Sequence, residues 1–308
     1  MIKIKRIRRP RGAVIHENSI CPPVMRQNLD YFTFPGLSEL DVVEHLFTTR
    51  TGGVSRGDLA EMNLSYSRGD DAENVLENYQ RIARVLNCRA QDMVTSDQTH
   101  TVNIRTVTAR DKGKGVVCAR DYTNVDGLIT DVPGICLVTL YADCVPLYFV
   151  DPVKRAIGLS HSGWKGTVKH MAVKTAEAMT EAFGCHPQNI HTAIGPSICQ
   201  ECYEVSDDVA EAFQEAFRGT DDILYEINSK GLYDCHDRSI LVKGRDASKF
   251  RLDLWLCNLI LLRKCGIPAE NIEVTDVCTC HNSSYLFSHR ASGGKRGNLG
   301  AFLMLKKY

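Results

Sequence analysis

Three residues of metal-binding type stand at the ends of stretches that the sequence indicates to be buried strands. They are His100 in SDQTH, Cys144 in YADCVPL and His161 in LSHSGWKG. Two imidazoles and a thiolate are ligand types that zinc prefers, and three protein ligands leave a fourth position open, as in catalytic zinc sites. The three residues lie far apart in the sequence and match no zinc-finger spacing. Spacing alone therefore favours three unrelated buried side chains.

The other cysteines raise a second question about metal binding. The chain has 13 cysteines, and its basic start, MIKIKRIRRPRG, has no apolar run of the kind that a signal peptide needs. We therefore expect a cytoplasmic protein whose thiols are mostly packed rather than paired in disulfides. A structural site of four thiolates, Cys199, Cys202, Cys278 and Cys280, is a competing hypothesis, but the C-x-C spacing is unusual for it. Packing is the default, so Cys199 and Cys280 are predicted to be dispensable.

Three glycine-rich basic stretches could bind an anion. They are TTRTGGVS with Arg50, HSGWKGT with Lys165, and SHRASGGKRGN with Arg290 and Arg296. Glycines let backbone amides approach a ligand, and a helix that begins after a strand favours an anion at its N-terminus. The order GxxxxGK[ST] of a Walker phosphate loop does not occur in HSGWKGT. Each stretch alone is more typical of a solvated turn, whereas all three beside a metal site would form a phosphate pocket.

Composition sets the class of protein. The 308 residues are 44% hydrophobic, and 37 Lys and Arg balance 37 Asp and Glu, so the formal net charge is zero. This balance argues against a general nucleic-acid or membrane-surface binder. No stretch approaches the roughly 18 apolar residues of a membrane span. We expect no nucleic-acid and no membrane partner, and the sequence does not indicate an oligomeric state.

Helices and strands are mixed without regular alternation, which predicts a single α+β domain. Residues 1–40 are expected to be an irregular extension, residues 41–308 the catalytic domain, and residues 219–250 an aperiodic surface insertion. The periodicity predicts helices over 73–87, 165–183, 206–217 and 251–265. It predicts strands at about residue 94 and over 101–107, 125–129, 135–141, 145–150, 156–161, 190–194, 272–277, 285–288 and 301–305.

Several of these motifs, in the same order, resemble one known family. The chain is similar to the YfiH-type proteins, first described as laccase-like polyphenol oxidoreductases and later as zinc-dependent purine nucleoside phosphorylases with adenosine deaminase activity. The resemblance runs from about Glu44 to Leu305. It rests on TTRTGGVS, MNLS, DQTH, DGLIT, ADCVPL, HSGWKGT, GPSICQECYEV, LDLW and the CT…FSHR…GKRG segment.

The resemblance implies a fold, a metal and a set of substrates. The fold would be a sandwich-like mixed β core flanked by helices, of the YfiH-like or cytotoxic necrotizing factor-like class. The family's zinc ligands fall on His100, Cys144 and His161. The implied substrates are phosphate and a purine nucleoside (adenosine, inosine, guanosine or methylthioadenosine), giving the free base and ribose 1-phosphate. Adenosine would also be deaminated by attack of a metal-activated water on C6.

Roles for other side chains are hypotheses at this stage. Asp143, next to Cys144, is the carboxylate offered for catalysis or for orienting a ligand. Arg50, Lys165 and Arg290 are hypothesised to hold phosphate, because cationic side chains, and guanidinium groups above all, suit its geometry. Asn63 is hypothesised to contact the sugar or the base.

Two other classes of function remain open. A copper-dependent polyphenol oxidase would also use His and Cys, but three ligands make one mononuclear site and the sequence has no HxH pair for an oxygen-reducing cluster. A cysteine hydrolase would use Cys144 as nucleophile and His161 as base. Metal analysis and chelation would distinguish these classes, and copper is the less favoured metal.

Overall fold

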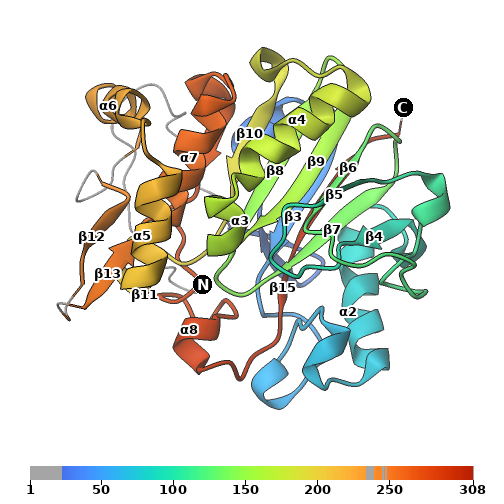
Figure 1. The fold of residues 1–308 in the computed structure, drawn as a ribbon. Helices are drawn as coiled ribbons and strands as arrows, with labels where there is room; N and C mark the ends of the chain where they lie inside the picture. The colour runs from blue at the N-terminus through green and yellow to red at the C-terminus, as the bar shows by residue number, and fades with distance from the viewer. Residues whose placement is uncertain (1–22, 234–238, 245, 247, 308) are drawn as a thin grey trace.

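The computed structural model describes residues 23–233, 239–244, 246 and 248–307, and within them the strands form three sheets (Figure 1). The first sheet has the order β1 (Pro23–Arg26), β2 (Leu29–Phe32), β3 (Val43–Thr48), β15 (Leu299–Leu305), β7 (Cys136–Tyr141) and β4 (Met93–Thr95). The second has the order β14 (Ile272–Val274), β10 (His191–Ile194), β8 (Val145–Asp151), β9 (Ala156–Ser162), β6 (Gly127–Thr130) and β5 (Ile104–Thr106). The third has the order β11 (Glu204–Ser206), β13 (Lys249–Leu252) and β12 (Leu241–Lys243). Both six-stranded sheets are mixed, which confirms the α+β prediction.

Helices are packed on the outer faces of the two large sheets. The described helices are α1 (Pro35–Glu39), α2 (Ala72–Val85), α3 (Trp164–Val168), α4 (Met171–Phe183), α5 (Asp207–Ala216), α6 (Asp221–Ser229), α7 (Leu254–Lys264) and α8 (His289–Ser292). In Figure 1, α4 lies across β8 and β9, and α2 lies at the lower right of the view. None of the described helices is long and apolar enough to cross a membrane.

The sandwich has one core between the sheets and one under each layer of helices. Phe47 and Leu303 of the first sheet share a buried cluster with Tyr148 and Leu159 of the second. Separate clusters place α4 and α7 against the second sheet and α2 against the first. Because strands of both sheets are buried on two faces, they read as continuous apolar runs rather than alternating ones. The connection from β7 to β8 passes from one sheet to the other, and Cys144 lies in it.

Helix α2 shows how well a strong pattern predicts an element. Asp71 caps it by accepting the Glu73 amide at 2.9 Å, and Val75, Tyr79 and Ile82 form its buried face. The prediction of a helix over 73–87 is confirmed to within two residues. The helix predicted over 165–183 is instead divided into α3 and α4, because His170 adopts a left-handed conformation with φ of 62°. Apolar periodicity continues across this break and conceals it.

Other expectations about irregular segments were wrong. Residues 23–40, expected to be irregular, form β1, β2 and α1, and β2 pairs with β3; residues 1–22 lie outside the described part. The segment 219–250, expected to be aperiodic, contributes α6, β12 and the start of β13. Strand β13 takes residues from the predicted helix 251–265, which begins at Leu254 after the Asp253 cap. Residues 285–288 form no strand but lead into α8.

A buried carboxylate between α1 and β14 gives the fold a pH-dependent stability. Glu273 is 6% exposed, and its Oε2 accepts the Leu37 amide at 3.3 Å. Burial raises the pKa of Glu273 from 4.5 to about 7, although the amides of Gly36 and Leu37 oppose this. The native state therefore holds this proton more tightly than the unfolded state, so stability falls as pH rises from 4.5 to 7. Above pH 7 the full cost is about 3 kcal/mol.

We expect Glu273→Gln to be more stable than the wild type at pH 8, by up to about 3 kcal/mol, and to lose most of that advantage at pH 4.5. Glutamine keeps an acceptor for the Leu37 amide but has no charge to bury. Denaturant unfolding at the two pH values measures the difference, with Glu181→Gln on the exposed side of α4 as the control for a lost charge. An advantage that is equal at both pH values would contradict this account.

Candidate metal centre and cavity

The structure brings His100, Cys144 and His161 together. His161 lies near the end of β9, Cys144 in the connection from β7 to β8, and His100 in the loop between β4 and β5. One ligand atom of each lies within 4.8 Å of the other two. His161 is buried, Cys144 is half-buried and His100 is exposed, so the group is open on the His100 side. Three convergent ligands with one open side fit a catalytic zinc site.

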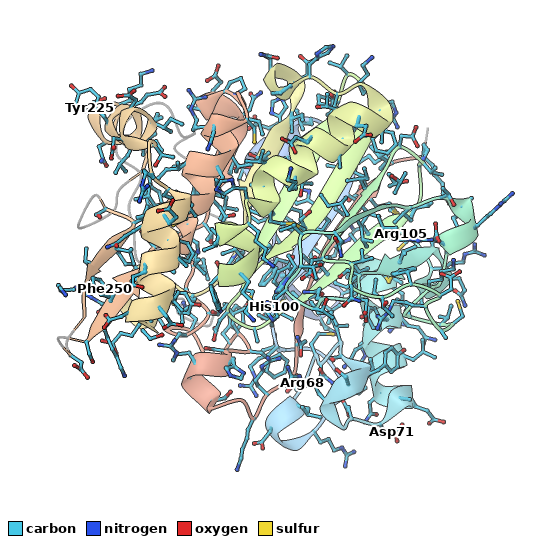
Figure 2. The ribbon with its side chains drawn as sticks, viewed as in Figure 1. Arg68, Asp71, His100, Arg105, Tyr225 and Phe250 are labelled. Atoms are coloured by element: carbon cyan, nitrogen blue, oxygen red, sulfur yellow. The ribbon has the colours of Figure 1, made fainter. Side chains whose placement is uncertain are left out.

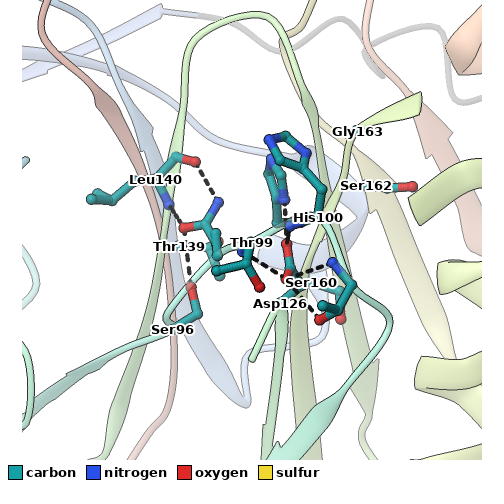
Figure 3. A network of polar contacts seen from close by, with 12 residues as sticks. Ser96, Thr99, His100, Asp126, Thr139, Leu140, Ser160, Ser162 and Gly163 are labelled. Carbon is teal, nitrogen blue, oxygen red and sulfur yellow. Dashed lines mark hydrogen bonds and ion pairs between the residues drawn. The ribbon is translucent and has the colours of Figure 1, made fainter. Parts of the chain in front are cut away.

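Asp126, which directly precedes β6, positions both histidines. Its carboxylate is fully buried, and Oδ1 lies 2.8 Å from His161 Nδ1. The same carboxylate accepts the backbone amides of Thr99, His100 and Thr101 at 3.0, 3.1 and 2.9 Å, as Figure 3 shows in part. A hydrogen bond from Nδ1–H to Asp126 leaves His161 Nε2 to bind a metal. Asp126 thus sets the ring orientation of one ligand and the backbone position of the other.

Gln98 anchors the same loop to the first sheet. Its Nε2 donates to the Leu140 carbonyl at 2.7 Å, and its Oε1 accepts the Leu140 amide at 2.7 Å and the Ser96 hydroxyl at 3.0 Å (Figure 3). His100 itself has φ of 63°, a left-handed conformation that costs free energy for a residue with a side chain. The bonds of Gln98 and Asp126 hold this conformation on both sides of the loop. This explains why the motif DQTH, rather than a lone histidine, accompanies the site.

Charge around the three ligands favours neutral His100 and a strongly held proton on His161 when no metal is bound. Burial and the neighbouring His161 lower the pKa of His100. Burial would also lower the pKa of His161, but interactions with Cys144 and with the Asp126 carboxylate raise it to about 9. Burial likewise opposes ionisation of Asp126, yet the bonds from His161 and the backbone amides hold its pKa at about 2. The site is therefore built around negative charge, which suits a dication.

Gly163 leaves the space in which a metal would lie. A Cβ at this position would come 2.9 Å from His100 Nδ1 and 3.0 Å from Cys144 Sγ. Its backbone, with φ of −73° and ψ of 178°, is one that alanine adopts freely. Crowding of the ligands is therefore the direct effect of a substitution here.

We expect Gly163→Ala to lower metal affinity by about 10–100-fold, as changes beside a ligand do, while the protein stays folded. Gly166→Ala, three residues later in α3, is the matched control, because its Cβ would meet the nearest atom at 3.5 Å, an ordinary contact. Zinc titration with a competing chelator measures both. Equal affinities for the two variants would show that the space at Gly163 is not the metal position.

The three ligands open into a large cavity. Its volume is about 770 Å³, within the usual range for small-molecule sites. Tyr66, Tyr79 and Tyr122 supply aromatic wall, and Asp97 is the carboxylate among the described lining residues. Both Asp97 oxygens are engaged, with Arg120 Nη2 at 2.9 Å and the Asn124 amide at 3.1 Å.

Two further arginines line the same cavity. Arg68 and Arg296 both donate to Asn298 Oδ1, at 3.1 and 2.6 Å. Arg296 is 8% exposed, and its Nε has no hydrogen-bond partner within the part of the chain that the structure describes. Burial and then repulsion by Arg68 lower the pKa of Arg296 to about 10. Figure 2 labels Arg68 below His100, on the loop that precedes α2.

The residues predicted to bind phosphate or sugar lie elsewhere. Arg50 donates to the carbonyls of Ala60 and Ser283 at 2.8 and 3.0 Å and lies over the Phe287 ring. Arg290 donates to the carbonyls of Cys202 and Glu204 at 3.0 and 2.9 Å. Lys165 is exposed on α3, and among the lining residues of the described chain none of these three occurs. The structure thus gives Arg50 and Arg290 backbone partners rather than a place in the cavity.

Asn63 and Asp143 support the site from outside the cavity. Asn63 is fully buried, and its Oδ1 accepts the Asn298 amide at 3.0 Å, which ties the two cavity loops together. The Asp143 carboxylate accepts the Thr279 hydroxyl at 2.6 Å and the Arg290 amide at 2.7 Å. Both carboxylate oxygens of Asp143 are therefore engaged away from the three ligands, which fits the orienting role offered for it rather than direct catalysis.

Comparison with known proteins assigns the chain to a family. The family described as multi-copper polyphenol oxidoreductase laccase matches residues 44–306. This chain belongs to that family. A YfiH protein of Bacillus licheniformis, described as hypothetical, shares the fold with a TM-score of 0.79 and 31% identity, over 92% of this chain and 99% of the other.

Curated relatives in this laccase-like family carry other names. Purine nucleoside phosphorylase YlmD of Bacillus subtilis is 36% identical, over 85% of this chain and 88% of its own length. Adenosine deaminase RL5, from an unknown prokaryotic organism, is 33% identical over 83% of this chain and 91% of its own. The family's description and its relatives' names therefore point to different chemistries.

Asp126, Arg68 and Arg296 are among the residues around the ligands and the cavity of this laccase-like protein to which the sequence gave no role. Asp126 begins DGLIT, a motif that the resemblance already included. An acidic residue directly before a buried strand was the signal that could have marked it as a site residue. Arg296 was noted in its glycine-rich stretch without a role. Arg68 gave no signal, because only the fold brings it to Asn298.

Proposed function

We propose that this protein is a zinc-dependent purine nucleoside phosphorylase. Phosphate would displace the base from adenosine, inosine or guanosine, giving the free base and ribose 1-phosphate, and from methylthioadenosine, giving adenine and 5-methylthioribose 1-phosphate. The observation that carries the proposal is that three metal ligands and a buried arginine with an unpartnered nitrogen line one cavity. The names of the relatives support the same class of reaction.

Arg68 and Arg296 are the proposed phosphate site. Two guanidinium groups that share one acceptor, Asn298 Oδ1, repel each other, and the buried one has lost most of its hydration. An anion between them would relieve the repulsion. Guanidinium groups bind phosphate in bidentate fashion. This replaces Arg50, Lys165 and Arg290 as the proposed phosphate ligands.

The purine base is proposed to lie along the tyrosine wall. Tyr66 and Tyr79 have ring centroids 6.2 Å apart at an interplanar angle of 16°, and the Tyr66 hydroxyl is fixed by the Val116 carbonyl at 2.8 Å. Tyr66 is 40% exposed, so one of its faces is available to a flat ligand. Aromatic rings of this kind suit stacking with a purine.

His100, Cys144 and His161 would hold the zinc ion in the same cavity as this wall and the arginines. The donor set fits zinc, and Gly163 leaves the room that the ion needs. When bound, zinc supplies a Lewis acid that polarises a ligand atom and acidifies water. Asp126 would keep His161 in the tautomer that can bind the ion.

Adenosine deaminase activity is proposed as a second reaction of the same cavity. In it, the oxygen of a water molecule replaces the C6 amino group, and ammonia leaves. Support comes from the open three-ligand set and from the relative named adenosine deaminase RL5. Phosphorolysis and deamination would then share the zinc and the tyrosine wall, whereas Arg68 and Arg296 would serve phosphorolysis alone.

Metal exchange tests the proposal against oxidase chemistry, which the family description names. Metal-free protein is reloaded with zinc or with copper and is given either adenosine with phosphate or a phenol with oxygen. We expect the zinc protein to consume adenosine and neither form to oxidise the phenol at a comparable rate. Phenol oxidation by the copper form, with no nucleoside consumed by the zinc form, would establish the oxidase instead.

A further inference from the structure

A second group of metal-ligating side chains lies outside the cavity. Cys199, Cys202, Cys278 and His281 each place one ligand atom within 4.8 Å of the others. Two of them come from the loop that follows β10 and two from the loop that follows β14. The sequence patterns are C-x-x-C and C-x-x-H, and Cys₃His is a common ligand set of structural zinc sites. His281, rather than Cys280, completes the group, so the four-thiolate hypothesis had the wrong fourth residue.

The four side chains are close enough to share one ion. His281 Nδ1 lies 3.6 Å from Cys199 Sγ, and His281 Nε2 lies 3.3 Å from Cys202 Sγ. With Zn–S of about 2.3 Å and Zn–N of about 2.0 Å, tetrahedral coordination separates sulfur and nitrogen by about 3.5 Å. Each of the two distances is close to this value, and since only one ring nitrogen can bind the ion, a rotation of the His281 ring would complete the site with the sulfurs where they are.

The backbone around Cys278 favours a thiolate. Cys278 is fully buried, and its Sγ accepts the amide N–H groups of Cys199 at 3.3 Å and His281 at 3.5 Å. Amide donors stabilise the charged form of sulfur, which is the form that ligates metals. A buried thiolate also needs a counter-charge, and a dication among the three sulfurs supplies it.

The two loops that carry the ligands are tied together. Ser197 and Cys278 form a parallel bridge, and the Thr279 amide donates to the Ser197 carbonyl at 3.0 Å. These bonds set the C-x-x-C turn against the C-x-x-H turn, as the two halves of a four-ligand site require. If the cysteines were only packed thiols, the fold would have no need for the His281 imidazole against them.

We propose that Cys199, Cys202, Cys278 and His281 bind a second zinc ion, which has a structural role. Four protein ligands close the coordination shell and leave no position for substrate. This ion is distinct from the one proposed at Cys144, and the proposal stands whether or not the protein is a phosphorylase.

The second ion would brace the turn that carries Cys144. Thr279, next to Cys278, donates to the Asp143 carboxylate at 2.6 Å, and the Ile198 amide, next to Cys199, donates to the Asp143 carbonyl at 3.0 Å. Asp143 itself has φ of 86°, a conformation that its surroundings must hold in place. Loss of the second ion should therefore loosen the loop behind Cys144 and lower the melting temperature.

Zinc stoichiometry tests the proposal directly. After zinc loading and exhaustive dialysis, we expect two zinc ions per wild-type chain and two in Cys280→Ser, the matched control two residues from Cys278. Cys202→Ser and Cys144→Ala should each retain one, and the double variant none. One ion in the wild type that disappears in Cys144→Ala, or two ions in Cys202→Ser, would overturn the proposal.

Cobalt substitution keeps the test valid if Cys202→Ser does not fold. Cobalt added to the Cys144→Ala protein should give the intense thiolate charge-transfer and visible bands of tetrahedral cobalt at one equivalent. Removing that cobalt with a chelator should lower the melting temperature, as the loss of a bound metal does. Cys144→Ala protein that shows neither the bands nor the shift would refute the second site.

Discussion

Cys144→Ala is expected to remove the cavity metal and to abolish turnover of nucleosides. The thiolate is one of three ligands, and the two histidines alone would bind zinc weakly. Losing the ion removes several kcal/mol of transition-state stabilisation, so both phosphorolysis and deamination should fall by at least about a thousandfold. The protein should remain folded, because the side chain is only half-buried.

Cys118→Ala is the matched control for this variant. Cys118 is an exposed thiol that lines the same cavity but lies outside the ligand group. The Cys118→Ala protein should retain the metal and near-normal rates, as measured by metal analysis and by chromatography of the purine products. A Cys144→Ala protein with the metal content and activity of the wild type would exclude this residue as a ligand. The same variant also tests the cysteine-hydrolase alternative, since a cysteine hydrolase would lose activity without any change in metal content.

Arg296→Met is expected to separate the two proposed reactions. Methionine fills the buried volume but cannot hold phosphate, and one charge-assisted hydrogen bond contributes about 1.5–3 kcal/mol. Phosphorolysis should therefore fall by about 10–100-fold, with the loss confined to phosphate-dependent turnover. Deamination, which uses no phosphate, should change little.

Lys295→Met is the matched control for Arg296→Met. It removes one positive charge from the adjacent residue of the same loop, which is exposed and outside the lining of the cavity. Steady-state rates at varied phosphate give the comparison, and unfolding curves check that Arg296→Met keeps its structure. Equal loss of both reactions in Arg296→Met would mean that this arginine shapes the whole cavity rather than binding phosphate.

Sequence alone predicted the elements that carry strong periodic patterns. Helix α2 and strands β7, β8 and β9 were found nearly to the residue, because their apolar runs are long and end at clear polar or turn residues. The break at His170 was missed, since a single left-handed residue does not disturb the period of the side chains. Strands β1 and β2 were missed because they are short, and their pairing with β3 depends on contacts distant in sequence.

The residues of the candidate site also fall into some that the sequence predicted and some that it did not. The three candidate ligands stood out by residue type, but spacing alone did not join them into a set; the family resemblance did, and the structure brings them together. Substrate contacts were not identifiable, since an arginine in a glycine-rich loop can equally bind backbone carbonyls, as Arg50 and Arg290 do. Arg68 and Arg296 become a pair only through Asn298, and the loops that carry them are separated by more than two hundred residues. Their meeting is a property of the fold.

Product analysis of adenosine with and without phosphate tests the central claim most directly. Zinc-loaded protein, saturated with adenosine, is sampled over time by chromatography. With phosphate present, we predict adenine and ribose 1-phosphate in equal amounts, at a rate that rises with phosphate and saturates; without phosphate, adenine should not form and inosine with ammonia should appear slowly. Adenine formation that is independent of phosphate, with free ribose as the second product, would contradict the account, because the arginine pair would then serve no phosphate.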